Sequence, residues 1–544
     1  MSVESTVVQV DGTLREPRAD LEHGTIPRMV QASAARFDAT EAIVDGDERI
    51  TYAELGRLAL EATRATIALG IEPGDRVAIW APNSARWILA ALGILGAGAQ
   101  LVTVNTRFKA AEAVDILRRT NARAIFTVNG FLGTDYLELL RAEAPDLPCL
   151  DRDILLSGPP SGPSFSWESF VALAEAIDPT EADARIKASG PDDVSDILFT
   201  SGTTARPKGV LLTHGQSLRG YQAFNVDFGL RHGDRYLIVS PFFHCMGYKS
   251  GWMLSFMTGA TCVPVPVLDQ DDLPALVERE RISVFPGPPT LVSTLLDAPD
   301  RDRYDLSSLR VTMVGASSVP AELFRRLRTE LPFENVLTGY GLTECHALVS
   351  TTGPQESPEV IATTVGRPLP GLEVMIVGPD DEPLPTGEAG EILVRGYTVM
   401  RGYLDDPEAT AEAITPDGWL HTGDVGLLDE RGFIHLTDRK KDIFIVGGFN
   451  VSPAEVEATL VEHEAVAQVS VVGGPDARMG EVAVAFVVLR PGVELSESDL
   501  IAWARPRLAN YKVPRHVHFV DSLPVNASLK VLRSELRLRA AELA

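Results

Sequence analysis

The chain has 544 residues, of which 45% are hydrophobic and 23% are charged. This length exceeds what one hydrophobic core serves, so we expect two or more domains, and the composition excludes a disordered or fibrous protein. The formal net charge of -26 argues against nucleic acid and anionic membranes as partners.

Cysteine usage and the N-terminus predict a cytoplasmic protein. The cysteines lack metal-ligand spacing and are too few for a disulfide scaffold in so long a chain. The first residues, MSVESTVVQVDGTLREPRADLEHG, lack the cationic start and apolar block of a signal peptide. The most apolar stretch, 87–104, is interrupted by glycines, so we expect a helix and a strand there and no membrane span. The cysteines are Cys149, Cys245, Cys262 and Cys345.

The first clear structural unit lies between residues 75 and 104. An apolar strand (RVAIW) is followed by a Pro-Asn turn, an amphipathic helix (SARWILAALGIL), a glycine corner and a second strand (QLVTV). This order predicts a βαβ unit. Strand-like runs also end in loops rich in Gly, Ser and Thr at 197–209, 311–320 and 335–344. Ligands of open parallel sheets gather at such loops.

The pattern changes after Gly371 to short alternating segments with turn signals, which predicts a β-rich subdomain. A charged run, TDRKKD, then marks a boundary near Asp438. We therefore expect an α/β protein: a large N-terminal domain, 1–438, with parallel-sheet βαβ layers plus the β-rich subdomain, and a small α+β domain, 439–544, which the resemblance described below implies is mobile. In the latter, Ser452, Pro453 and Glu455 predict a helix start with an N-cap, a first-turn proline and a capping-box glutamate.

The strongest chemical signal is FTSGTTARPKG, residues 199–209, directly after an apolar run. Its hydroxyls and backbone N–H groups can donate to phosphate, its glycines allow close approach, and Lys208 supplies a positive charge. Pro207 replaces the second glycine of a Walker A loop, so that motif is excluded. A hydroxyl-rich stretch alone is more often a plain turn.

The segment resembles the TSGTTGxPKG loop of the adenylate-forming superfamily, to which the acyl-CoA ligases belong. Further motifs of that family follow in order along nearly the whole chain. The resemblance implies that this loop holds the β- and γ-phosphates of ATP, and that Thr203 also meets the magnesium ion. The implied phosphate-binding residues are Thr200, Ser201, Gly202, Thr203, Thr204 and Lys208.

Two segments resemble the family's adenine-binding elements. TGYGLTE, 338–344, resembles the YGxTE element, in which Tyr340 lies against adenine and Glu344 helps to hold magnesium. Gly315-Ala316-Ser317 resembles the loop beside adenine and the α-phosphate, although each segment could be only a turn. Gly339, Gly341 and Thr343 belong to the implied nucleotide site.

Ribose and hinge motifs follow. WLHTGD, 419–424, resembles the segment whose aspartate, here Asp424, accepts hydrogen bonds from the ribose hydroxyls. DRKKD, 438–442, resembles the hinge, with Arg439 near ribose and Lys441 at the position that switches the C-terminal domain. Without the family resemblance, residues 419–424 would be interpreted as a capped turn and residues 438–442 as a solvated run of charges.

Three further segments resemble parts that act on the acid and on coenzyme A. GGF, 447–449, resembles the lining of the pantetheine tunnel, where Gly447 and Gly448 allow close approach of the backbone and Phe449 follows. A hairpin turn without a binding role is the alternative. FFHCMGY, 242–248, resembles the acyl-pocket strip with a histidine gate. NASLKVLR, 526–533, resembles the stretch whose lysine, here Lys530, stabilises charge on the α-phosphate. The implied acid-contacting residues are Phe243, His244, Gly247 and Tyr248, and the implied catalytic residues are Lys530, His244, Glu344 and Gly448.

Two departures fall on the ATP half-reaction. Ala205 and Leu529 stand where the family usually has glycine. Forcing a non-glycine residue to positive φ costs on the order of 1 kcal/mol, and more if the loop must also close tightly, so both changes stiffen loops used for adenylation. Asp424, Tyr340 and Gly448 remain, which suits transfer of a preformed acyl-AMP to CoA. The departures resemble a diterpenoid acyl-CoA ligase that acts on a preformed adenylate.

The expected function is formation of a CoA thioester from a bulky polycyclic or terpenoid acid through acyl-AMP, with impaired adenylation. An ordinary two-step ligase and a non-catalytic adenylate-binding protein are the alternatives. The expected cofactors are ATP or AMP, coenzyme A and, if adenylation occurs, Mg²⁺. The expected partners are the acid or its adenylate, and the sequence leaves open a separate adenylating ligase and a homodimer.

Overall fold

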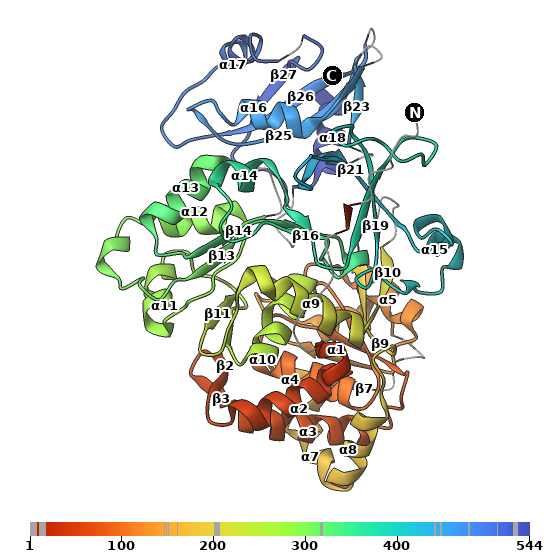
Figure 1. The fold of residues 1–544 in the computed structure, drawn as a ribbon. Helices are drawn as coiled ribbons and strands as arrows, with labels where there is room; N and C mark the ends of the chain where they lie inside the picture. Colours follow the sequence, from red (N-terminus) through yellow and green to blue (C-terminus); the bar gives the residue numbers. More distant parts are fainter. Residues whose placement is uncertain are drawn as a thin grey trace.

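The computed structural model describes most of the chain. The described residues are 18–145, 147, 150, 152–159, 162–200, 207–315, 319–439, 442–446, 449–476, 479–508, 510–525 and 531–543, with the backbone alone at 8–9, 437–439, 445 and 449–450. Figure 1 shows the N-terminal part in red to green and the C-terminal part in blue at one end of the molecule.

A mixed sheet forms the base of the N-terminal domain. In spatial order its strands are β20 (Gly402–Tyr403), β10 (Lys208–Thr213), β9 (Val194–Thr200), β5 (Gln100–Thr103), β4 (Arg76–Trp80), β6 (Ala124–Val128), β7 (Arg152–Ser157) and β8 (Phe165–Ser166). From β9 to β8 neighbouring strands are parallel, whereas β10 and β20 join antiparallel. The predicted βαβ unit is confirmed as β4, α4 (Ala85–Gly96) and β5.

The helix expected to be amphipathic, α4, is instead buried on every side from Trp87 to Gly96, which explains why this part of its sequence is apolar. Only Arg86, in its first turn, is charged and partly buried. Helix α4 packs on α3 (Tyr52–Ala68) so closely that a Cβ at Gly93 would lie 2.8 Å from the carbonyl oxygen of Ala62. The glycines of this stretch are therefore helix-packing sites. Other helices of this half are α1 (Ala19–Glu22), α2 (Ile26–Phe37), α5 (Ala110–Thr120), α6 (Tyr136–Glu143), α7 (Trp167–Ala172), α8 (Pro179–Ala188) and α9 (His214–Phe228).

A second layer has its own sheet. Its strands are β11 (Arg235–Ile238), β12 (Thr261–Pro264), β2 (Glu41–Asp45) and β3 (Glu48–Thr51), and bridges at Val284 connect β11 to the parallel pair β13 (Val311–Met313) and β14 (Asn335–Leu337). Its helices are α10 (Leu254–Thr258), α11 (Leu273–Glu280), α12 (Pro289–Asp297), α13 (Ala321–Glu330) and α14 (Pro358–Thr363). A π-helix, η2 (Met246–Met253), precedes α10.

The β-rich subdomain is confirmed as an antiparallel sheet. Its strands are β1 (Val8–Gln9), β18 (Glu373–Val377), β19 (Gly390–Arg395), β21 (Leu420–Leu428) and β22 (Ile434–Arg439). Nearby lie the short strands β15 (Gly339–Tyr340), β16 (Ser350–Thr351) and β17 (Arg367–Pro368), the 3₁₀ turn η4 (Thr343–Cys345) and α15 (Pro407–Ala413).

The C-terminal strands belong to a separate sheet. In spatial order it has β24 (Phe449–Val451), β23 (Phe444–Val446), β26 (Gly480–Leu489) and β25 (Val466–Asp476), and β27 (His516–Phe519) pairs with β26. Its helices are α16 (Pro453–Leu460), α17 (Glu497–Ala504) and α18 (Arg533–Leu543). The predicted helix start is confirmed, because Ser452 Oγ accepts from the Glu455 N–H at 3.2 Å. The domain boundary at 438/439 stays a prediction.

Candidate active site

The phosphate loop predicted from the sequence is a hairpin connection between β9 and β10. Thr200 and Lys208 are cross-strand partners at the ends of these antiparallel strands. A loop closed in this way differs from a Walker A loop, which leads from a strand into a helix. The predicted phosphate-binding roles stay predictions for four residues of this loop that lie outside the described part of the chain: Ser201, Gly202, Thr203 and Thr204.

Lys208 and Glu344 both contact the side chain of Tyr403. No motif in the sequence indicates Tyr403 as a site residue. The Lys208 Nζ lies 4.7 Å from the ring centroid, and the Tyr403 hydroxyl donates to Glu344 Oε1 at 3.0 Å. Burial, followed by the charge of Glu344, raises the pKa of Tyr403, so the phenol keeps its proton and donates. An ammonium and a carboxylate thus face one small region, which suits a phosphate and its counter-ion.

The carboxylate of Glu344 fits the predicted magnesium role. Among the described residues, no group of three His, Cys, Asp or Glu side chains could hold a metal ion. Magnesium in nucleotide sites commonly has one or two protein carboxylates and takes its other ligands from phosphates and water. Glu344 therefore needs the nucleotide to complete such a site, and the role stays a prediction.

Tyr340 and Asp424 are hydrogen-bonded although they lie far apart in the chain. The Tyr340 hydroxyl donates to Asp424 Oδ2 at 2.6 Å, and Asp424 is 7% exposed. Burial, followed by Asp424, raises the pKa of Tyr340 well above its usual value. Asp424 also pairs across β21 and β22 with Arg439, of which only the backbone is described. The predicted adenine position, Tyr340, and the two positions predicted near ribose, Asp424 and Arg439, are therefore neighbours.

The glycines of this region allow close backbone packing. A Cβ at Gly341 would lie 2.1 Å from the carbonyl of Ala347, and one at Gly339 would lie 2.7 Å from the Ser350 oxygen. Thr343 begins η4, which carries Glu344. Gly315 follows β13, and among the described residues the atom nearest to a Cβ built there is Thr338 Oγ1, at 4.0 Å. Ala316 and Ser317 lie outside the described residues.

The predicted acyl strip begins ahead of η2. Phe243 is buried, and its ring contacts the partly buried His244 ring with centroids 4.7 Å apart. A Cβ at Gly247 would lie 2.3 Å from the carbonyl oxygens of Ser240 and Pro241, so η2 packs there backbone to backbone. Tyr248 is fully buried and stacks on Trp252, with its hydroxyl 3.4 Å from Asp196 Oδ2. Its contact with an acid stays a prediction.

The segments predicted to act through the C-terminal domain are described only in part. Lys441, Gly447, Gly448 and Lys530 lie outside the described residues, and for Phe449 the structure gives the backbone, which starts β24. Helix α16 contacts β22, so this domain meets the strand that carries Arg439.

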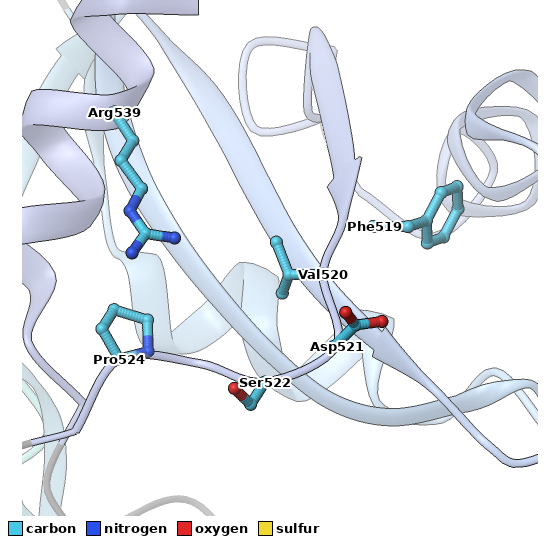
Figure 2. A pocket seen from close by; sticks show the side chains of 6 residues that line it. All are labelled: Phe519, Val520, Asp521, Ser522, Pro524 and Arg539. Carbon is cyan, nitrogen blue, oxygen red and sulfur yellow. The ribbon is translucent and has the colours of Figure 1, made fainter.

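Figure 2 shows a hollow in the C-terminal domain between α18 and the segment that follows β27. It measures about 420 Å³, and Arg539 reaches into it from α18. Arg539 also pairs with Glu535 at 2.5 Å. None of the residues that line the hollow is a predicted site residue. They are Phe519, Val520, Asp521, Ser522, Pro524 and Arg539. Among the described helices, none is long and apolar enough to cross a membrane.

Stacked α/β layers, an antiparallel subdomain, a small C-terminal sheet, the hydrogen bond of Tyr340 to Asp424 and the contacts of Tyr403 with Lys208 and Glu344 together indicate an adenylate-forming ligase. The family model for AMP-binding enzymes matches residues 30–404, and the model for their C-terminal domain matches 455–530. The chain belongs to this family and is an acid–thiol ligase of the acyl-CoA synthetase type.

Relatives match along almost the whole chain. A 3-[(3aS,4S,7aS)-7a-methyl-1,5-dioxo-octahydro-1H-inden-4-yl]propanoyl:CoA ligase from Rhodococcus jostii is 48% identical over 94% of this chain and 98% of its own length. The ligase of the same name from Mycobacterium tuberculosis is 46% identical over 94% and 98%. A crystal structure of an anthranilate CoA ligase with anthranoyl-AMP superposes with a TM-score of 0.86, at 26% identity over 97% of this chain and 99% of that one.

Proposed function

We propose that this enzyme joins a bulky, fused-ring carboxylic acid to coenzyme A through an acyl-AMP. The observation that carries the acid class is the identity of 48% and 46%, along nearly the full length, to two ligases named for a bicyclic dioxo-indenyl propanoate. The hydrogen bond of Tyr340 to Asp424 and the cluster of Lys208, Tyr403 and Glu344 support the nucleotide half of the reaction.

In the proposed first step, the acid's carboxylate attacks the α-phosphorus of ATP and pyrophosphate leaves. Lys208 balances phosphate charge and Asp424 accepts from the ribose hydroxyls. Glu344 would help to hold Mg²⁺, which would offset further phosphate charge. In the second step, the thiolate of CoA attacks the acyl carbon and AMP leaves. The roles of Lys530 beside the α-phosphate and of Gly448 along the pantetheine arm rest on the family resemblance.

We further propose that adenylation is the weaker half-reaction. Ala205 and Leu529 replace glycines in the two loops that serve this step, and both lie outside the described residues. A separate enzyme that forms the acyl-AMP would then be a functional partner. The ordinary two-step ligase remains the competing hypothesis.

A paired assay tests both proposals. One arm supplies the bicyclic dioxo-indenyl propanoic acid with ATP, Mg²⁺ and CoA, and the other supplies its synthetic acyl-AMP with CoA alone. We expect thioester in both arms, with the second at least tenfold faster. Equal rates would contradict impaired adenylation, and the absence of thioester from both arms would contradict the proposed acid.

A further inference from the structure

Lys249 and Asp196 form an ion pair without exposed surface. The Lys249 Nζ lies 3.0 Å from Asp196 Oδ1, and both side chains are 0% exposed. Lys249 also donates to Ser217 Oγ at 2.7 Å. Asp196 Oδ2 accepts from Ser195 Oγ at 2.6 Å and from the Tyr248 hydroxyl at 3.4 Å. Each charge therefore has a polar partner besides its counter-ion.

The ion pair connects segments that belong to different parts of the site. Asp196 lies on β9, the strand that ends at Thr200 and leads into the phosphate loop. Lys249 lies in η2, which follows His244 and contains Gly247. Ser217 lies on α9, where its hydroxyl donates to the Thr213 carbonyl at 2.8 Å. Lys249 thus fixes η2 to the strand and helix on either side of the phosphate loop.

A buried ion pair is a weak source of stability, because desolvation of two charges offsets most of their attraction and an apolar pair of similar volume often does as well. Such a pair can instead specify one arrangement of the chain. The arrangement here is unusual, because π-helices are rare and occur frequently at functional sites. The Leu254 N–H bonds to the Lys249 carbonyl. One residue therefore closes the π turn with its backbone and fixes it with its side chain.

Two buried imidazoles near Lys249 remain neutral. Burial, followed by the charge of Lys249, lowers the pKa of His214 to about 3 and that of His346 well below its usual value. Neither ring therefore competes with Lys249 for the carboxylate of Asp196 near neutral pH.

Building on the proposed ligase function, we propose that Lys249 is a positioning and specificity-determining residue. Paired with Asp196, it holds η2 in register with β9, and so sets the place of His244 and Gly247 beside the acid. Without the pair, η2 is free to relax toward the commoner α-helical spacing, which rotates the residues along it. The consequence is a change in which acids are accepted, with little change in the use of ATP or CoA.

The test compares Lys249→Met with the wild-type enzyme on the bicyclic dioxo-indenyl propanoic acid and on octanoic acid. We expect the KM for the bicyclic acid to rise at least tenfold and the ratio of kcat/KM between the two acids to fall at least tenfold. The KM values for ATP and CoA should stay within twofold. Asp196→Asn should act in the same direction, and the double variant should lose no more than the worse single variant, because the two residues act as one pair.

A second buried ion pair provides the matched control. Arg310 pairs with Asp234, with side chains 9% and 6% exposed, in the layer that carries β13. Arg310→Met should lower the melting temperature as Lys249→Met does, yet leave the ratio between acids unchanged. If Lys249→Met does not fold, Ser217→Ala tests the positioning role instead. This variant keeps the ion pair and removes the hydroxyl that accepts from Lys249. We expect a twofold to fivefold fall in the same ratio.

The outcomes distinguish a failure of the positioning role of Lys249 from a failure of the proposed acid. Folded Lys249→Met and Ser217→Ala enzymes that keep the wild-type ratio within twofold would overturn the positioning role. Absence of thioester from wild type with the bicyclic acid would overturn the proposed acid alone. The ratio between octanoic and benzoic acid, measured in the same variants, would then test the positioning role.

Discussion

Tyr340 and Asp424 form the best-defined contact of the site. Their 2.6 Å hydrogen bond joins the segment that the family resemblance assigns to adenine with the one assigned to ribose. A phenol fixed on a carboxylate has a defined ring orientation, and the carboxylate retains lone pairs for ribose hydroxyls. One contact can therefore orient both halves of a nucleoside.

Tyr340→Phe should weaken nucleotide use. Removal of a hydrogen bond to a charged acceptor costs about 1.5–3 kcal/mol, so we expect the KM for ATP to rise about tenfold or more. Steady-state kinetics with varied ATP measure this, and Tyr304→Phe, between α12 and β13 in the second layer, is the control. A KM within twofold of wild type would show that the hydroxyl does not orient the nucleotide.

Ala205→Gly combined with Leu529→Gly should restore adenylation. If closing on the β- and γ-phosphates requires a glycine-like backbone, the two residues together add about 3 kcal/mol to the first barrier, or roughly a hundredfold in rate. Acid-dependent ATP–pyrophosphate exchange should rise, while thioester formation from acyl-AMP stays constant. Brisk exchange by the wild type, equal to that of the variant, would show that both departures are tolerated.

Sequence motifs identify site residues that stand in a recognisable string. They do not identify residues that reach the site only through long-range packing. Tyr340, Glu344 and Asp424 stand in recognisable strings. Tyr403 does not, because its part in the site arises from β20 pairing with β10. A signal for Lys249 and Asp196 was present, since each is a charge within an otherwise apolar run, but the sequence could not show that they pair.

Among the elements, η2 is the one that local sequence could least specify. Its glycines and aromatics suit an ordinary helix, and its place in the fold depends on long-range packing, such as the close approach of Gly247 to the carbonyls of Ser240 and Pro241. The hairpin of β9 and β10 likewise depends on long-range pairing, whereas β4, α4 and β5 follow from hydrophobic periodicity alone.

Gly247→Ala should disturb both stability and use of the acid. The added Cβ would lie 2.3 Å from two carbonyl oxygens, so η2 must shift, at a cost of about 1–3 kcal/mol. Melting temperature and the KM for the acid report the two effects. Gly353→Ala is the matched control, because its nearest neighbour, Glu356 Cγ, lies 3.8 Å away. Equal behaviour of the two variants would contradict the packing argument.

At the scale of the molecule, the fold class followed from the order of strands, helices and turns, and the layered arrangement of the sheets follows from which faces are apolar. The sequence did not show that the polar cluster around Lys249 is enclosed by these layers. Its buried histidines give the whole protein a predictable response to acid.

Acidification should lower stability below the ordinary imidazole pKa. His214, with a pKa lowered from 6.5 to about 3, binds its proton in the unfolded chain first, so stability is fully present above pH 6.5 and falls as pH drops toward 3. The slope is about 1.4 kcal/mol per pH unit for each such group. Melting curves between pH 7 and about pH 5, above most carboxylate titration, measure it. His214→Gln should flatten the slope; a slope for this variant equal to that of the wild type would refute the assignment.

The most direct test of the account is a comparison of acyl donors at the thioester-forming step. The enzyme would be given CoA with either the synthetic adenylate of the bicyclic dioxo-indenyl propanoic acid or palmitoyl-AMP, and kcat/KM would be measured for each thioester. A fused-ring acyl-CoA ligase should prefer the bicyclic adenylate by at least tenfold. Preference for palmitoyl-AMP, or thioester from neither donor, would contradict the proposed function.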